Sequence, residues 1–199
     1  MASWARDAVG RERTPERMLR RLAWVEGRTL RAIELETGTA REVFHSRRAN
    51  CAGFAFLVSG LARSLGVAAV VVEVSDVVRE ERRGGLSIRH RHLAVGVRQG
   101  DALQVIDRDG VVSPGGHTFR VLEDRTAVAI YHSNRGAELL LAGHLDEARA
   151  HLERAVEVDA RFEPAWGNLR VACRRAGDAR AVAGCRGGQI PAAMNPPAP

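Results

Sequence analysis

Two kinds of apolar segment follow one another in the middle of this chain, and their lengths constrain what it can fold into. Asn50 is a favourable N-cap, and the mainly apolar residues 51–65 after it predict a helix that Gly66 ends. Residues 67–74 are apolar and mostly β-branched, but they are too few for a typical helix and predict a buried strand. The helix is therefore expected to pack against a sheet.

The segments that follow predict a β-hairpin. Residues 91–98 and 102–107 have the composition of strands, and Gly100-Asp101 between them is suited to a tight turn. Residues 78–87 are highly charged and contain two adjacent glycines, so we expect an exposed loop there.

Helical spacing predicts two more helices nearer the N-terminus. Thr14-Pro15-Glu16 is typical of a helix start, and the apolar stripe that follows extends to about Gly38. The opposite face of this helix is rich in arginine, which indicates a solvated face or, alternatively, a binding strip. Residues 39–45 predict a further short helix.

Composition narrows the classes of partner. The 199 residues suffice for one ordinary domain and a smaller one, and no segment reaches the roughly 20 apolar residues of a membrane span. The net charge of +6 invites a nucleic-acid function, but all 30 cationic residues are arginine and are scattered among 24 acidic ones. We therefore expect neither a membrane nor a nucleic-acid partner. Three cysteines and the lack of a signal-peptide pattern favour a cytoplasmic protein.

Cys51 is expected at the start of the predicted helix, where a thiolate is favoured. The first N–H groups of a helix are unpaired and the macrodipole is positive there, so both stabilise the reactive form of a thiol. The same N–H groups, including that of Cys51, can stabilise an oxyanion during acyl transfer. A buried cysteine that only fills space is the simpler alternative.

The hairpin register favours the reactive interpretation. With Gly100-Asp101 as the two turn residues, Ala94 lies opposite Asp107, and His92 and Asp107 become diagonal neighbours on one face, with Cβ atoms roughly 7 Å apart or less. A three-residue loop would place them on opposite faces. His90 and His92 have a spacing seen in metal sites, but no cluster of further ligands completes one. We expect no metal and no cofactor.

The order of these segments resembles the transglutaminase-like superfamily, a circularly permuted relative of the papain fold. The resemblance covers roughly residues 42–109 and rests on Asn50-Cys51-Ala52-Gly53-Phe54-Ala55, residues 61–67, residues 92–97 and Val105-Ile106-Asp107. It implies an α+β fold in which a Cys-bearing helix packs on a small antiparallel sheet. It also implies a catalytic triad of Cys51, His92 and Asp107.

The resemblance further implies a cysteine-nucleophile acyl-transfer enzyme that acts on an amide or ester bond of a peptide or protein substrate, as a peptidase, amidase or transglutaminase. The family often has Gly two residues before the cysteine and an aromatic residue two after the histidine, where this chain has Ala49 and Ala94. Some relatives are inactive, so the alternative is an inactive domain that acts as a protein–protein interaction module.

The C-terminal part of the chain is helical in pattern and contains an internal repeat of 34 residues. Asn134 aligns with Asn168, Ala142 with Ala176, and Gly143 with Gly177. This resembles a tetratricopeptide repeat, of which about three units are usually needed for stability. We therefore expect these helices to dock on the first domain or on a protein partner. A plain helical hairpin is the alternative.

These patterns together predict three regions. A transglutaminase-like core spans residues 14–125, and a tetratricopeptide-like helical region spans residues 126–186. Residues 187–199, which are rich in Pro and Ala, are expected to form a disordered tail.

Overall fold

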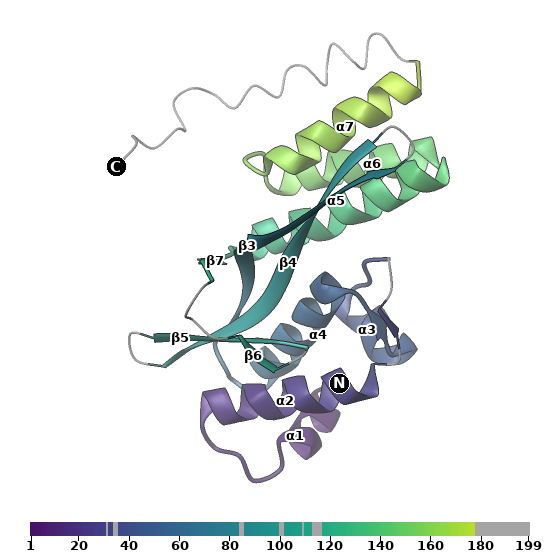
Figure 1. Ribbon diagram of the computed structural model, residues 1–199. Coiled ribbons are helices and arrows are strands. Elements are labelled where there is room, and N and C mark those ends of the chain that lie inside the picture. Colours follow the sequence, from purple (N-terminus) through teal and green to yellow (C-terminus); the bar gives the residue numbers. More distant parts are fainter. Residues whose placement is uncertain are drawn as a thin grey trace. The chain divides into compact units, whose positions relative to one another are not determined.

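The computed structural model describes residues 1–30, 32–33, 36–83, 86–99, 102–108, 110–112 and 117–177 (Figure 1). The chain has the α+β architecture that the sequence predicts, with helices and one larger antiparallel sheet. It divides into two compact units, Met1–Asp124 and a second that begins at Arg125. This division lies next to the expected boundary after residue 125, whereas the expected disordered tail lies outside the described residues.

The first unit begins with four helices and a short pair of strands. These are α1 (Ala2–Val9), α2 (Pro15–Thr29), β1 (Ala32–Ile33), α3 (Ala40–Ser46), β2 (Arg48–Ala49) and α4 (Cys51–Ser64). Helix α2 begins at Pro15 as predicted but ends at Thr29, well before Gly38. Residues after it form β1, which pairs in parallel with β2. Over so short a stretch, the apolar spacing fits the period of a helix and that of a strand equally well. Backbone pairing with β2 makes the segment a strand.

Local hydrogen bonds set the position of α4. The Asn50 side chain caps the helix by accepting a hydrogen bond from the Gly53 N–H at 2.9 Å, and its amide donates to the Thr37 hydroxyl at 2.8 Å. A Cβ atom on Gly53 would lie 2.9 Å from a methyl group of Val43, so glycine allows α3 and α4 to approach closely. Most of α4 is buried, which anchors its first residue, Cys51.

The sheet has five antiparallel strands in the order β6-β5-β4-β3-β7. These are β3 (Ala69–Arg83), β4 (Leu86–Gln99), β5 (Ala102–Asp107), β6 (Gly110–Val112) and β7 (Phe119–Val121). Val72, Val74, Ala94 and Val105 form a buried apolar cluster on three adjacent strands. The two outer strands, β6 and β7, are not predicted from the sequence.

The prediction of an exposed loop at residues 78–87 is wrong. Strands β3 and β4 pair across this region as far as Arg83 and Leu86, after a shift of register between Val74 and Val78. Only the two glycines between them lie outside the described residues. Charged side chains do not prevent a two-stranded ribbon from forming, because the backbone N–H and C=O groups of the two strands hydrogen-bond to each other whatever the side chains are.

The second unit consists of helices packed closely through small residues. They are α5 (Asp124–Ala142), α6 (Leu145–Val158) and α7 (Glu163–Arg175). Gly143 and Gly177, which follow α5 and α7, adopt positive φ angles of 86° and 68°. The two aligned glycines therefore both lie in the positive-φ region.

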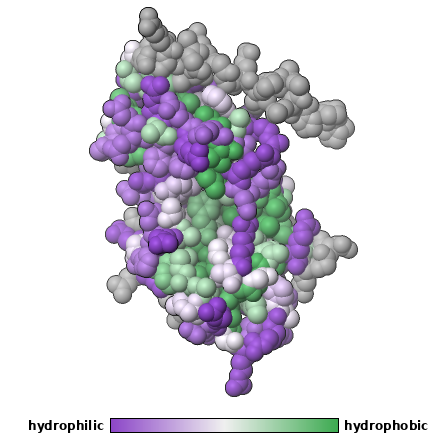
Figure 2. All heavy atoms as spheres, turned by 180° about the vertical axis from the view of Figure 1, so that it is seen from behind, coloured by the Kyte–Doolittle hydropathy of each residue, from purple (hydrophilic) through white to green (hydrophobic). Residues whose placement is uncertain are grey.

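Apolar side chains appear among hydrophilic ones on the face shown in Figure 2. Large apolar residues that are exposed include Val121, Val128 and Leu141. Within the described residues, no helix combines the length and apolar character needed to cross a membrane.

Candidate active site

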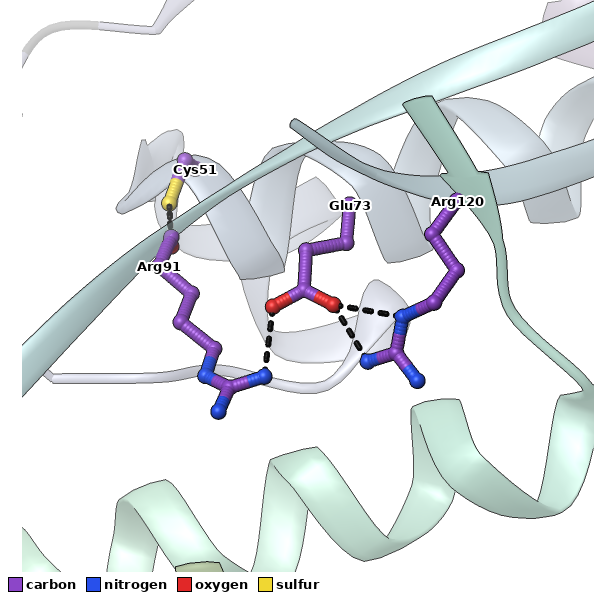
Figure 3. Close-up of polar contacts among 4 residues, drawn as sticks. All are labelled: Cys51, Glu73, Arg91 and Arg120. Carbon is purple, nitrogen blue, oxygen red and sulfur yellow. Dashed lines mark hydrogen bonds and ion pairs between the residues drawn. The ribbon is translucent and has the colours of Figure 1, made fainter. Parts of the chain in front are cut away.

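Cys51 faces the backbone of β4 from the first turn of α4 (Figure 3). Its Sγ atom lies 3.7 Å from the carbonyl oxygen of Arg91, and the N–H of Leu93 also hydrogen-bonds to it. Residues two apart in a strand direct their backbone groups to the same side, so these two groups flank the sulfur. The pairing of β4 with β5 stops at Val95 and Ile106. The thiol approaches the part of β4 that precedes Val95, where β5 no longer pairs with it.

His92, which lies between Arg91 and Leu93, links Cys51 to Asp107. Its side chain hydrogen-bonds to the sulfur, and its Nε2 atom lies 3.1 Å from Oδ2 of Asp107. Gln99 pairs with Ala102, which is the register that places His92 and Asp107 on one face; the intervening turn residues lie outside the described ranges. The structure thus brings all three sequence-predicted site residues together.

Electrostatics place a proton on His92. Burial raises the pKa of the Cys51 thiol, but hydrogen bonds from His92 and from the N–H groups of Leu93 and Ala52 outweigh burial and hold the pKa below its usual value of 9.0. Asp107 first, and then Cys51, raise the pKa of His92 to about 10. The site therefore favours transfer of the thiol proton to His92, that is, a thiolate–imidazolium pair. The protonated thiol can donate a hydrogen bond to the Arg91 carbonyl oxygen at 3.7 Å, a contact that favours the thiol form.

A buried carboxylate supports the same strand. Glu73 on β3 is 5% exposed and contacts two arginines, with Oε1 2.7 Å from Nη1 of Arg91 and Oε2 2.9 Å from Nε of Arg120 (Figure 3). Burial raises the pKa of Glu73, but the two guanidinium groups more than offset it, so the pKa is lowered. Arg91 therefore contacts Cys51 with its backbone and Glu73 with its side chain.

The Glu73 cluster is a part of the site that sequence reasoning missed. A signal was present, because Glu73 stands alone among β-branched residues in the predicted buried strand. A carboxylate inside such a strand requires charged partners. The sequence pattern could not identify these partners, because Arg91 and Arg120 lie on β4 and β7, far along the chain from Glu73.

The site holds groups for nucleophilic attack and proton transfer. Among the residues that the structure describes, no cluster of three or more His, Cys, Asp or Glu side chains is arranged to hold a metal ion. Cys51 is the free cysteine within these residues. A cysteine beside a histidine that is itself bound to a carboxylate is the arrangement used in cysteine-dependent acyl transfer. Comparisons of the chain with protein-family models, with curated proteins and with solved structures found no match, so this interpretation rests on the geometry of the site.

Proposed function

We propose that this protein is a cysteine-nucleophile acyl-transfer enzyme of the transglutaminase-like type, acting on an amide or ester bond. The observation that carries the proposal is the continuous series of contacts from Cys51 through His92 to Asp107. A cysteine that only fills space has no need of an imidazole held in place by a carboxylate. The α+β fold, with the cysteine at a helix start and the histidine on a strand, supports the same assignment.

In this mechanism the Cys51 thiolate attacks the carbonyl carbon, and the π electrons of the carbonyl move to its oxygen. The backbone N–H of Cys51, at the first position of α4, helps to stabilise that oxyanion. When the tetrahedral intermediate collapses, the amine or alcohol leaves with the proton of the His92 imidazolium. The neutral imidazole then deprotonates water, which releases the acid and restores the thiolate; an amine in place of water completes transamidation.

Asp107 keeps the imidazole in its working orientation throughout. Its carboxylate accepts a hydrogen bond from Nε2, so the other ring nitrogen is directed to the sulfur. The carboxylate also stabilises the positive charge of the imidazolium.

Alkylation by a haloacetamide across pH tests the activated thiol directly. We expect Cys51, identified by peptide mapping, to alkylate at lower pH than a thiol with the ordinary pKa of 9.0, because its pKa is lowered. In a His92→Ala chain the thiol loses its main stabilising partner, and the reactive range should move above that of an ordinary cysteine because burial remains. Identical profiles for the two chains would refute the proposal. A Cys51→Ser chain serves as the control for labelling at other residues.

The second candidate function is an inactive transglutaminase-like domain that works as a protein–protein interaction module through the helical region. It is favoured by Gly143 and Gly177, which align in the 34-residue repeat, follow α5 and α7, and both have positive φ angles. A Cys51→Ala chain separates the two proposals. If that chain supports the biological function of the protein as well as the natural one does, the interaction module is the better assignment.

A further inference from the structure

Two histidines face each other between α5 and α6 in the second unit. Nδ1 of His132 lies 3.1 Å from Nδ1 of His151, and the ring centroids are 5.2 Å apart. Both side chains are partly buried. Tyr131 packs edge-on against both rings, at 5.1 Å from His132 and 6.3 Å from His151. Neither histidine belongs to the proposed active site.

The backbone explains why the two rings meet. Gly136 lies one helical turn after His132, and a Cβ atom there would be 2.5 Å from Cγ of Leu152 and 3.1 Å from the Ala148 carbonyl oxygen. Glycine thus lets α5 and α6 approach closely beside the pair. Leu152 is the neighbour of His151, so the same close approach brings the two imidazoles together.

The surroundings favour neutral imidazoles. Burial, then the charges of His151 and Arg154, lower the pKa of His132. Burial, then Arg135, lower the pKa of His151, whereas the negative charge of Glu147 acts in the opposite direction. Neutral imidazole is the form that binds metal ions.

Nearby arginines do not exclude a cation. Arg135 forms an ion pair with Glu138 at 2.7 Å, and Arg154 forms one with Glu157 at 2.8 Å. Each arginine therefore has its charge partly cancelled locally, and Glu147 adds a negative charge next to His151.

We propose that His132 and His151 form a binding site for a divalent transition-metal ion such as Zn²⁺, with Nδ1 of each ring as a ligand. With metal–nitrogen bonds of about 2.0 Å, two nitrogens on one ion lie roughly 2.8 Å apart at a 90° angle and roughly 3.3 Å apart at a tetrahedral angle. The 3.1 Å separation falls between these values. The bound ion would hold α5 against α6.

The proton balance of binding is simple. Without metal, one Nδ1 carries a hydrogen and donates it to the other. Metal binding needs both lone pairs, so the donating ring moves its proton to Nε2 and both rings stay neutral. Water fills the remaining coordination positions, since no third ligand of the His, Cys, Asp or Glu type completes the group in the described chain.

Calorimetric titration of Zn²⁺ into the tag-free Cys51→Ser form of the 199-residue chain tests the proposal, because that substitution removes a competing sulfur ligand. We expect His132→Gln and His151→Gln each to weaken Zn²⁺ binding by about tenfold or more. The matched control is His144→Gln, since His144 lies on the same helical hairpin but pairs with Glu147 at 3.3 Å. Its affinity should stay within about twofold of the parent chain.

Nitrogen-15 NMR of the imidazoles in the parent chain provides a measurement without substitution at the site. Zn²⁺ should shift the Nδ1 resonances of His132 and His151 and leave that of His144 in place. The proposal is overturned if no binding occurs up to about 1 mM Zn²⁺. It is also overturned if the double variant binds as well as its parent, or if Zn²⁺ shifts other histidines instead. None of these results depends on the acyl-transfer activity.

Discussion

At the scale of single residues, the reactivity of this protein depends on where one proton lies. Cys51 is buried, and burial alone would keep the thiol protonated. The hydrogen bond from His92 reverses this effect, and Asp107 keeps the proton on His92 by raising its pKa to about 10. The lowered pKa of the thiol therefore depends on His92, which in turn depends on Asp107.

An Asp107→Asn substitution should shrink the pH range over which the thiolate–imidazolium pair exists. Without the carboxylate the pKa of His92 falls from about 10, because Asp107 is the main group that raises it. The upper limit of the range thus moves down, so the range becomes narrower. Thiolate absorbance near 240 nm, titrated against a Cys51→Ser baseline, measures both limits. Unchanged limits would show that Asp107 does not govern the pair.

At the scale of secondary-structure elements, close approach and buried charge decide which elements meet. Gly53 and Gly136 let helices pack where a methyl group would collide. In the sheet, Glu73 joins three strands, because its carboxylate contacts Arg91 on β4 and Arg120 on β7. The ion pairs of Glu73 depend on particular side chains that pair across strands.

Gly136→Ala tests the close approach of α5 and α6. The added Cβ would lie 2.5 Å from Leu152, so we expect a loss of about 1–2 kcal/mol in unfolding free energy, after allowing for the better helix propensity of alanine. Gly167→Ala is the matched control, because nothing lies within 4 Å of a Cβ atom at that helical position. It should stabilise the protein by about 0.5–1 kcal/mol. Denaturant unfolding of both variants measures the difference, and equal effects would contradict this packing.

Glu73→Gln tests the buried carboxylate. Neither guanidinium keeps a charged partner, and we expect a loss of about 1–3 kcal/mol, reduced from the full cost of a buried pair because Arg91 and Arg120 are 32% and 53% exposed. Cys51 should also alkylate more slowly, since Arg91 precedes His92 on β4 and a displaced His92 would lower the pKa of the thiol less.

The control for this substitution is Asp124→Asn. Asp124 pairs with Arg63 at 2.8 Å, but its side chain is 73% exposed, so the pair should contribute less than about 1 kcal/mol. If the two variants lose the same stability and both keep the alkylation rate, Glu73 has no special role in holding β4.

At the scale of the whole molecule, the chain is basic but much of its charge is paired. Ion pairs of the described residues include Arg47–Glu26, Arg63–Asp124, Arg91–Glu73, Arg135–Glu138 and Arg149–Glu153. A net charge of +6 spread in this way produces weaker local fields than a continuous basic strip would.

Binding to nucleic acid should therefore be weak and independent of base sequence. For a labelled RNA of about 20 nucleotides at about 150 mM salt, we expect a Kd no tighter than the non-specific range of roughly 10⁻⁴–10⁻⁶ M. Fluorescence anisotropy with two unrelated RNA sequences gives this measurement. A Kd near 10⁻⁸ M for one sequence alone would instead establish specific recognition.

The candidate active site is largely predictable from the sequence because its geometry is local. Asn50 caps α4 through a residue three positions away, which places Cys51 in the first turn. A two-residue link between strands determines that His92 and Asp107 share a face, since side chains alternate along a strand. Both inferences require only short-range rules. The C-terminal helices follow from apolar spacing in the same way.

Other features depended on pairing between distant segments, which no short-range pattern encodes. Residues 78–83 form a strand because β4 supplies partners for their backbone, although their charge indicates a loop. The end of α2 at Thr29 follows from pairing between β1 and β2. Glu73 obtains its arginines, and His132 its partner His151, only when strands and helices pack. The sequence by itself thus determined the local elements and the order of the reactive residues, whereas tertiary structure decided which backbone edges and charged side chains meet, because these contacts gain free energy only once the chain has folded.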